Sequence, residues 1–79
     1  MQPPPGPGGG GSLDVWTVYD NPKDYPGWFV ARRFTLDGPT GDTMTARRLE
    51  DLRNSLMTMG LTCIPRSPED DPVIVESWI

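Results

Sequence analysis

The stretch VWTVYDNPKDYPGWFVARRFTL, residues 15–36, decides the fold, because two strand-like runs in it hold most of the aromatic side chains. In the first run, residues 15–20, Trp16 and Val18 alternate with more polar residues, which is the two-residue period of a β-strand. We expect Trp16 and Val18 to face the core. The second run, residues 28–36, is apolar on both faces, so polarity does not indicate its inward face. Together the two runs predict a long β-hairpin.

The segment between the two runs, residues 20–27, is a predicted loop. Two turn signals divide it, Asn21-Pro22 near its start and Pro26-Gly27 at its end. Asparagine bonds its own backbone, proline fixes φ, and glycine permits a positive φ. The loop is too long for a tight turn, so we expect it to be exposed and semi-rigid.

The first twelve of the 79 residues, MQPPPGPGGGGS, show no apolar periodicity. Proline favours extended chain and glycine flexible chain, so we expect residues 1–12 to be a disordered tail or linker. The remaining residues, 13–79, are enough for one small domain and too few for two.

A helix is predicted over residues 46–59, after a turn cluster at residues 37–42. Thr45 is the expected N-cap, because its hydroxyl can accept a hydrogen bond from an amide of the first turn. Gly60 is the expected left-handed stop. The apolar stripe of this helix consists of Leu49, Leu52, Leu56 and Met59. We expect the methionines Met44, Met57 and Met59 to join the core.

Two further strands are predicted, at residues 61–64 and 73–79, with an acidic, proline-bracketed loop at 65–72 between them. The element order β-β-α-β-β predicts an α+β fold, an antiparallel sheet of three to four strands with one helix packed on one face. The sheet face away from the helix, called the second sheet face below, then carries Phe29, Ile74 and Trp78. Two interpretations of that face stay open: an apolar patch for a dimer or partner, or a surface covered by the two loops.

Composition excludes several kinds of chemistry. The chain has no histidine, which removes the commonest general base and the commonest transition-metal ligand. Its one cysteine, Cys63, lies in an apolar context, so we expect inert burial. We therefore expect no enzyme activity, no catalytic residue, no metal site and no cofactor. No apolar run reaches the roughly 20 residues that span a bilayer, which favours a cytoplasmic protein.

A resemblance appears in residues 16–34, WTVYDNPKDYPGWFVARRF, and in the tail SPEDDPVIVESW, residues 67–78. These segments are similar to a group of short proteins from bacteria, phages and mobile elements, with a W-x-V-Y-D-x-P-x-D-Y-P-x-x-F-V-A-R-R core. The similarity covers most of residues 13–79. It implies no activity and no catalytic residue. By analogy, the resemblance to small proteins of mobile elements suggests an inhibitor, since anti-CRISPR proteins belong to that class.

Charge points to the kind of partner. The chain carries eleven acidic and seven basic residues, a net charge of −4, which favours basic partners. Carboxylates on stiff loops can occupy the place of phosphates in a nucleic-acid-binding groove. We therefore expect binding to a basic protein surface, such as that of a CRISPR effector complex. The expected contact residues are Asp20, Asp24, Tyr25, Trp28, Glu69, Asp70 and Asp71.

Two alternatives remain open. One is a homodimer that associates through the exposed sheet face with Ile74 and Trp78. The other is a single-strand nucleic-acid binder, in which Arg32 and Arg33 lie on a strand beside Phe29 and Phe34 as a stacking surface.

Overall fold

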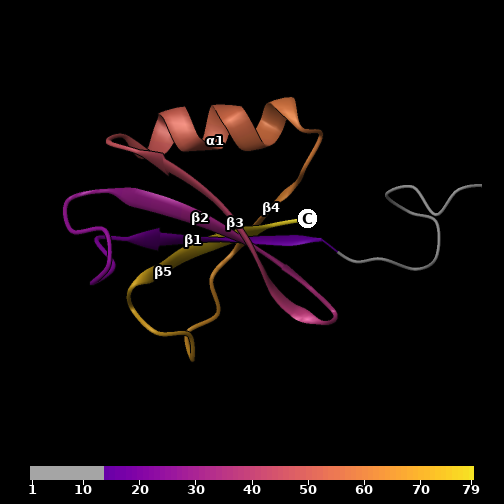
Figure 1. Cartoon of the computed structure of the whole chain (residues 1–79), viewed down its shortest axis with the longest axis horizontal. Helices are drawn as coiled ribbons and strands as arrows, with labels where there is room; N and C mark the ends of the chain where they lie inside the picture. The colour runs from indigo at the N-terminus through magenta and orange to yellow at the C-terminus, as the bar shows by residue number, and fades with distance from the viewer. Residues whose placement is uncertain (1–13) are drawn as a thin grey trace, which may run out of the picture.

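The computed structural model describes residues 14–79, so the predicted tail, residues 1–12, lies outside the described part of the chain. These residues form an open five-stranded antiparallel sheet with one helix across one face (Figure 1). The elements are β1 (Val15–Asp20), β2 (Phe29–Thr35), β3 (Gly38–Ala46), α1 (Leu49–Thr58), β4 (Cys63–Pro65) and β5 (Ile74–Trp78). The α+β class with a single helix is confirmed, whereas the expected count of three to four strands is wrong.

The strand order in space is β3-β2-β1-β5-β4, so β1 is the central strand. The predicted hairpin is the β1–β2 pair, with Trp16 opposite Arg33 and Tyr19 opposite Val30. On its other side, β1 pairs with β5, with Trp16 opposite Trp78. The stretch that the sequence singles out therefore supplies the middle of the sheet.

β3 is the strand that the sequence interpretation missed, because its first half consists of turn-forming residues. Arg32 pairs with Thr43 and Phe34 with Pro39, so residues 40–42 lie opposite a single residue of β2. Gly41 adopts a φ of +90° within this bulge, a conformation that glycine reaches without steric cost. A proline and a bulge are tolerated because β3 is at the edge of the sheet.

The helix begins later than predicted. Its N-cap is Arg48, whose side chain makes no capping hydrogen bond. Thr45 lies in β3 opposite Val30. The ladder with β2 continues to Ala46, and its backbone hydrogen bonds override the local capping preference of Thr45. The predicted stop is confirmed: Gly60 has a φ of +82°. The amides of residues 60 and 61 donate to the carbonyls of residues 57 and 56, the pattern of a Schellman motif.

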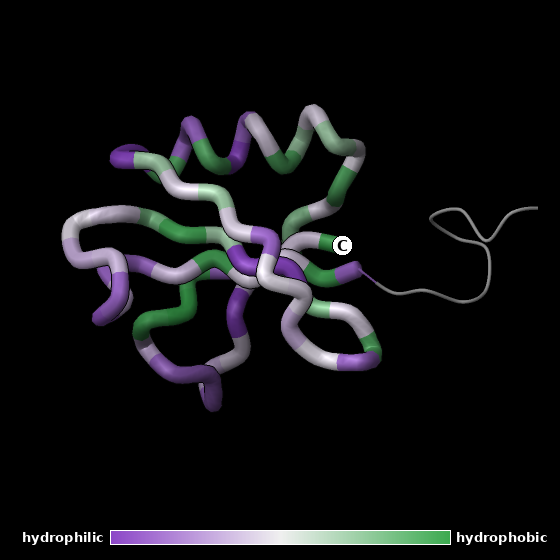
Figure 2. The backbone as a smooth tube through the Cα atoms, in the orientation of Figure 1, coloured by the Kyte–Doolittle hydropathy of each residue, from purple (hydrophilic) through white to green (hydrophobic). Residues whose placement is uncertain are grey.

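The core lies between α1 and the sheet, where Figure 2 shows apolar segments of the helix facing apolar segments of the strands. Its buried members are Trp16, Val18, Ala31, Leu52, Leu56 and Trp78. The inward orientation of Trp16 and Val18 is confirmed. Met44 packs against this cluster, but Met57 and Met59 are exposed, so the expectation that all three methionines join the core is wrong.

A bulge in β5 corrects the prediction for the second sheet face. Val18 pairs with Glu76 and Tyr19 pairs with Ile74, so Val75 is an extra residue in β5. Because of this shift, Trp78 lies under the helix in the core, and Phe29 also packs there. Of the three residues expected on the second face, only Ile74 lies there, opposite Tyr19.

One charged residue is buried among residues 14–79, Glu76, at 3% exposure of the whole residue. Arg53 of α1 donates to both carboxylate oxygens, from Nη2 at 2.7 Å and from Nε at 3.0 Å. The indole Nε1 of Trp78 donates to the same carboxylate at 2.8 Å. The hydrogen bonds from Arg53 lower the pKa of Glu76. This pair fixes the helix to β5, and Cys63, which was expected to be buried, is exposed next to it.

Candidate partner-binding surface

The β1–β2 loop and the β4–β5 loop lie together at one end of the sheet, on the side away from α1 (Figure 1). The amide of Asp20 donates to the carbonyl of Val73 at 2.8 Å, which fastens one loop to the other. Both loop tips are hydrophilic, as Figure 2 shows. Of the two interpretations left open for the second sheet face, the one in which the loops cover it agrees with this end of the sheet.

The β1–β2 loop is held by its own turn residues. Asn21 has a positive φ of 54°, and its Oδ1 accepts from the amide of Gly27 at 2.7 Å, across the base of the loop. Arg47 donates from Nη1 to the carbonyl of Gly27 at 3.2 Å, and its guanidinium lies 4.0 Å from the ring centre of Trp28. The loop is therefore tied at its end to the segment before α1.

The acidic β4–β5 loop forms a hydrogen-bonded turn. Asp70 Oδ2 accepts from the amide of Ser67 at 2.9 Å, and Glu69 Oε1 accepts from the hydroxyl of Ser67 at 2.8 Å. Asp71 Oδ1 accepts from the amide of Val73 at 3.0 Å. Each of the three carboxylates thus makes one bond inside the loop and keeps its remaining lone pairs for solvent or a partner. Among residues 14–79, none of them forms an ion pair.

Arg32 lies on the sheet face between the loops. Its guanidinium is 5.6 Å from the ring centre of Tyr19 and 6.0 Å from that of Tyr25, within cation–π range of both. Nη2 donates to Asp24 Oδ2, and this hydrogen bond lowers the pKa of Asp24. Arg32 Nε is buried and has no hydrogen-bond partner among the described residues.

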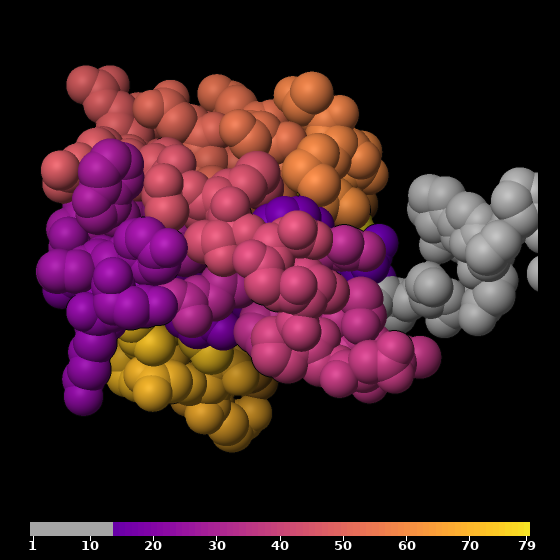
Figure 3. Space-filling view, viewed as in Figure 1, coloured from indigo at the N-terminus to yellow at the C-terminus, as the bar shows by residue number. Residues whose placement is uncertain are grey.

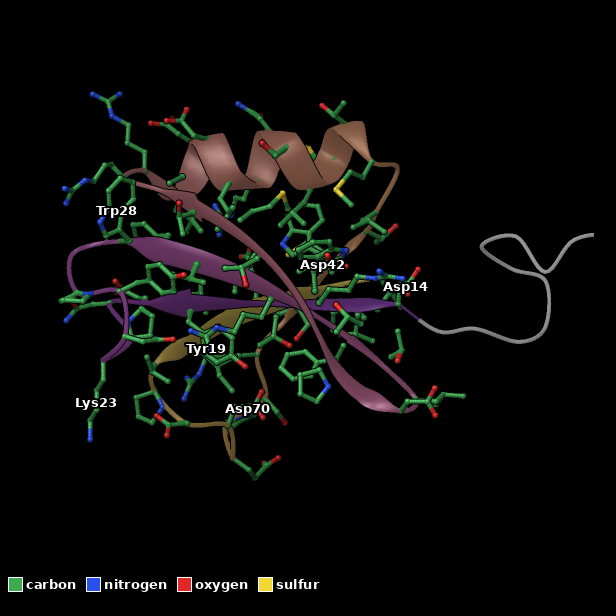
Figure 4. All side chains as sticks on the ribbon, in the orientation of Figure 1. Asp14, Tyr19, Lys23, Trp28, Asp42 and Asp70 are labelled. Carbon is green, nitrogen blue, oxygen red and sulfur yellow. The ribbon has the colours of Figure 1, made fainter. Side chains whose placement is uncertain are left out.

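These groups border an open hollow of about 440 Å³. The hollow is lined by Tyr19, Asn21, Pro22, Lys23, Asp24, Arg32, Asp71 and Val73. Its charges are mixed, and Figure 4 shows the side chain of Lys23 pointing away from the molecule on this side. The arrangement offers aromatic faces, a fixed guanidinium and exposed carboxylates within one surface.

The structure brings most of the predicted contact residues together. Asp24 and Asp71 line the hollow, and Asp20 is exposed at the end of β1. The ring of Tyr25 lies beside Arg32, which also lines the hollow. The exception is Trp28, which lies toward the start of α1 and away from Lys23 and Asp70 (Figure 4). Asp24 also differs from the expectation, because it is internally neutralised by Arg32.

The two arginines of β2 do not form one surface. Arg33 faces the helix side, opposite Trp16, where it pairs with Asp14 and Asp42, each at 2.8 Å. Arg32 faces the other side. The separation arises because adjacent strand residues point to opposite faces. The sequence did not indicate which acidic residues the arginines meet, since Asp24 comes from a loop, Asp42 from the bulge of β3 and Asp14 from the segment before β1.

A scan against protein-family models and searches of curated proteins and of solved structures find no match for this chain. Among residues 14–79, no helix has the length and apolar character needed to cross a membrane.

Proposed function

We propose that this chain is a small non-enzymatic binding protein whose acidic loops dock on a basic, nucleic-acid-binding surface of another protein. One observation carries the proposal. The carboxylates of Glu69, Asp70 and Asp71 stand in one turn, bonded to the loop and to no cation among the described residues. A charge that is held in place and not neutralised internally is available to a partner.

The rigidity of the loops supports this role. A side chain or loop that is ordered before binding loses less conformational entropy when the complex forms. The turn around Ser67 and the Asn21–Gly27 clamp supply this order, and the bond from Asp20 to Val73 joins the two loops. Fixed carboxylates can then match the spacing of cationic groups on the partner.

The kind of partner follows from charge and from the resemblance to proteins of phages and mobile elements. With a net charge of −4, the chain is attracted to basic surfaces, and electrostatic steering accelerates such association. A CRISPR effector complex holds nucleic acid in a positively charged channel. An inhibitor of anti-CRISPR type would place the acidic loops in that channel and block the binding of target DNA.

The groups around the hollow favour binding over catalysis. Asp24 is hydrogen-bonded to Arg32, and its lowered pKa makes it a poor general base at neutral pH. The chain supplies no histidine for that task. The two alternative functions have less support: Trp78 is buried under α1, and Arg32 and Arg33 lie on opposite faces with ion-pair partners.

The experiment measures whether the chain blocks the binding of labelled target DNA by a guide-RNA-loaded CRISPR effector complex. The test variant is Glu69→Gln with Asp71→Asn, because both amides keep an oxygen for the hydrogen bonds inside the loop. The matched control, Glu50→Gln with Asp51→Asn, removes the same two charges from exposed positions on α1. We expect the test variant to lose inhibition and the control to keep it.

The salt dependence provides a second readout, because screening weakens an interaction between exposed charges. Inhibition by the native chain should decline as salt rises, and any inhibition that the test variant retains should depend less on salt. Equal inhibition by the two double variants would contradict a role of the acidic loop. Undisturbed DNA binding in the presence of the native chain would remove the proposed partner.

A further inference from the structure

We propose that the outer edge of β3 pairs with the same edge of a second copy of this chain, which joins two sheets into one. β3 is an end strand of the sheet, and Thr43 and Thr45 on it are exposed. Figure 3 shows β3 running across the surface that faces the viewer, below α1, with no other described segment in front of it. This edge is distinct from the acidic loops and from the hollow.

The hydrogen-bond ladder determines which backbone groups of β3 point outward. The amide of Asn21 donates to Trp28, and in an antiparallel pair every second residue bonds to the same neighbour. In β2, Val30 and Arg32 therefore bond toward β1, whereas Phe29 and Ala31 bond toward β3. The carbonyl of Arg33 follows the same alternation, because the hydroxyl of Thr40 on β3 donates to it.

Phe29 lies opposite Ala46, and Ala31 lies opposite Met44. The amides and carbonyls of Met44 and Ala46 are thus used by β2. Those of Thr43 and Thr45 point away from the sheet, so this short edge presents two donors and two acceptors.

These four groups are self-complementary about Met44. If a second copy approaches antiparallel, Thr43 of one chain faces Thr45 of the other, and the reverse pair forms by symmetry. Each such pair exchanges two backbone hydrogen bonds, which gives four across the interface. The threonines form cross-strand pairs on one face, and the two Met44 side chains meet on the other.

Charge also favours a second copy. The contact segment, residues 43–46, carries no charge, so no like charges are brought opposite one another. The acidic β4–β5 loop belongs to the other half of the sheet, beyond β1. Pairing through β3 therefore keeps the acidic loops of the two copies far apart, although each chain has a net charge of −4.

The opposite edge explains why the assembly stops at two copies. In β4, Thr62 exchanges two bonds with Ile79, so the next outward residues are Cys63 and Pro65. Pro65 has no amide to donate, and β4 is only three residues long. The β4 edge therefore offers few outward backbone groups for a β3 edge to bond, whereas another β3 edge offers matching donors and acceptors. The bulge at residues 40–42 limits the length of the new ladder, so we expect a weak and reversible dimer.

The first test is sedimentation equilibrium of the native chain and of Thr45→Pro over a wide concentration range. The proline removes an outward amide and none of the bonds to β2, so the sheet stays intact. The native chain should approach twice its 8.8 kDa mass as concentration rises, and Thr45→Pro should remain at 8.8 kDa. Circular dichroism verifies folding. If the proline variant does not fold, Thr45→Lys replaces it, with Thr62→Lys on the opposite edge as the matched control.

The second test is amide hydrogen exchange at low and high concentration. The amides of Met44 and Ala46 should be protected at both, whereas those of Thr43 and Thr45 should become protected only at high concentration. A native chain that stays monomeric at about 1 mM would overturn the proposal. So would a dimer that leaves the amides of Thr43 and Thr45 unprotected. Either failure leaves the proposed role of the acidic loops unchanged, because that role does not need a second copy.

Discussion

Removing the exposed partner of the Arg53–Glu76 pair should destabilise the protein more than removing the charge of the buried partner. The Arg53 side chain is 45% exposed, whereas that of Glu76 is 4% exposed. Arg53→Met leaves a buried carboxylate whose remaining side-chain partners are the indole of Trp78 and the neighbouring thiol of Cys63. Breaking a fully buried pair in this way costs roughly 3–5 kcal/mol, because the charge left behind is poorly hydrated. Since Arg53 is half exposed and its removal admits some water to Glu76, we expect a cost at the lower end of that range, about 3 kcal/mol.

Glu76→Gln should cost less. The glutamine keeps a carbonyl oxygen that can accept from Trp78 or Arg53, and the guanidinium left behind reaches solvent. The loss is then the difference between charge-assisted and neutral hydrogen bonds, about 1–2 kcal/mol in total. In the double variant Arg53→Met with Glu76→Gln, no charge is buried, so we expect it to be more stable than Arg53→Met alone.

The assay is urea unfolding followed by tryptophan fluorescence, since Trp16 and Trp78 are buried in the core beside this pair. The pH dependence gives a further check. The pKa of Glu76 is lowered from 4.5, so its contribution is present above that value and is lost as the pH falls through the folded-state pKa. In Arg53→Met, burial raises the pKa of Glu76 instead. That variant should therefore recover stability relative to the native chain as the pH falls from neutrality toward 4.5.

A larger loss for Glu76→Gln than for Arg53→Met at neutral pH would refute this reasoning. A constant loss in the free energy of unfolding of Arg53→Met across that pH range would also refute it. The loss would then come from lost packing of the arginine stem and not from an unpaired buried charge.

Three further predictions concern single positions. Leu56→Ala should cost about 2–5 kcal/mol in urea unfolding because Leu56 is fully buried, whereas Met57→Ala, at the adjacent exposed position, should stay within about 0.5 kcal/mol of the native chain. Gly60→Ala should cost about 1 kcal/mol by thermal or urea unfolding, since an added Cβ meets no neighbour within 4 Å and the cost comes from the φ of +82° alone; an unchanged midpoint would contradict this assignment. The Asp24 carboxyl, followed by NMR titration, should have a pKa below 3.8 that returns toward this value in Arg32→Ala, and an equal pKa in both proteins would show that Arg32 does not hold it.

The sequence predicts the elements whose side-chain pattern agrees with their local preferences. β1 has the expected bounds, and Trp16 and Val18 face the core as their alternation indicates. Gly60 ends the helix because no other residue adopts its φ as cheaply. In each case the signal lies within a few residues of the element that it describes.

The missed features depend on pairing with β2. Residues 37–42 have turn chemistry, and residues 38–42 become part of β3 only because β2 supplies a ladder with a bulge. Thr45 has a favourable capping side chain, but its backbone is held opposite Val30. The partner of Thr45 is 15 positions away, outside a local window. The partners of Gly38 and Pro39 are close, at Thr35 and Phe34, but the turn signals of this segment hide the start of the strand.

The same limit applies to the candidate surface. The acidic residues and the loops were predictable from composition, proline spacing and turn signals. Two contacts were not predictable: the ion pair of Asp24 with Arg32, and the packing of Trp28 against Arg47. Both depend on how the β1–β2 loop folds back. Of the predicted contact residues, Asp20, Tyr25, Glu69, Asp70 and Asp71 stay candidates, whereas Asp24 is paired with Arg32 and Trp28 with Arg47.

The bulge at Val75 connects the core to this surface. In a regular strand, residues 74, 76 and 78 would share a face, and either Ile74 would enter the core or Glu76 and Trp78 would leave it. The extra residue lets Glu76 and Trp78 meet Arg53 and the helix while Ile74 stays opposite Tyr19 on the other face. The carbonyl of Val73 is then in place for the amide of Asp20. The buried charge pair and the position of the acidic loop thus depend on the same irregularity in β5.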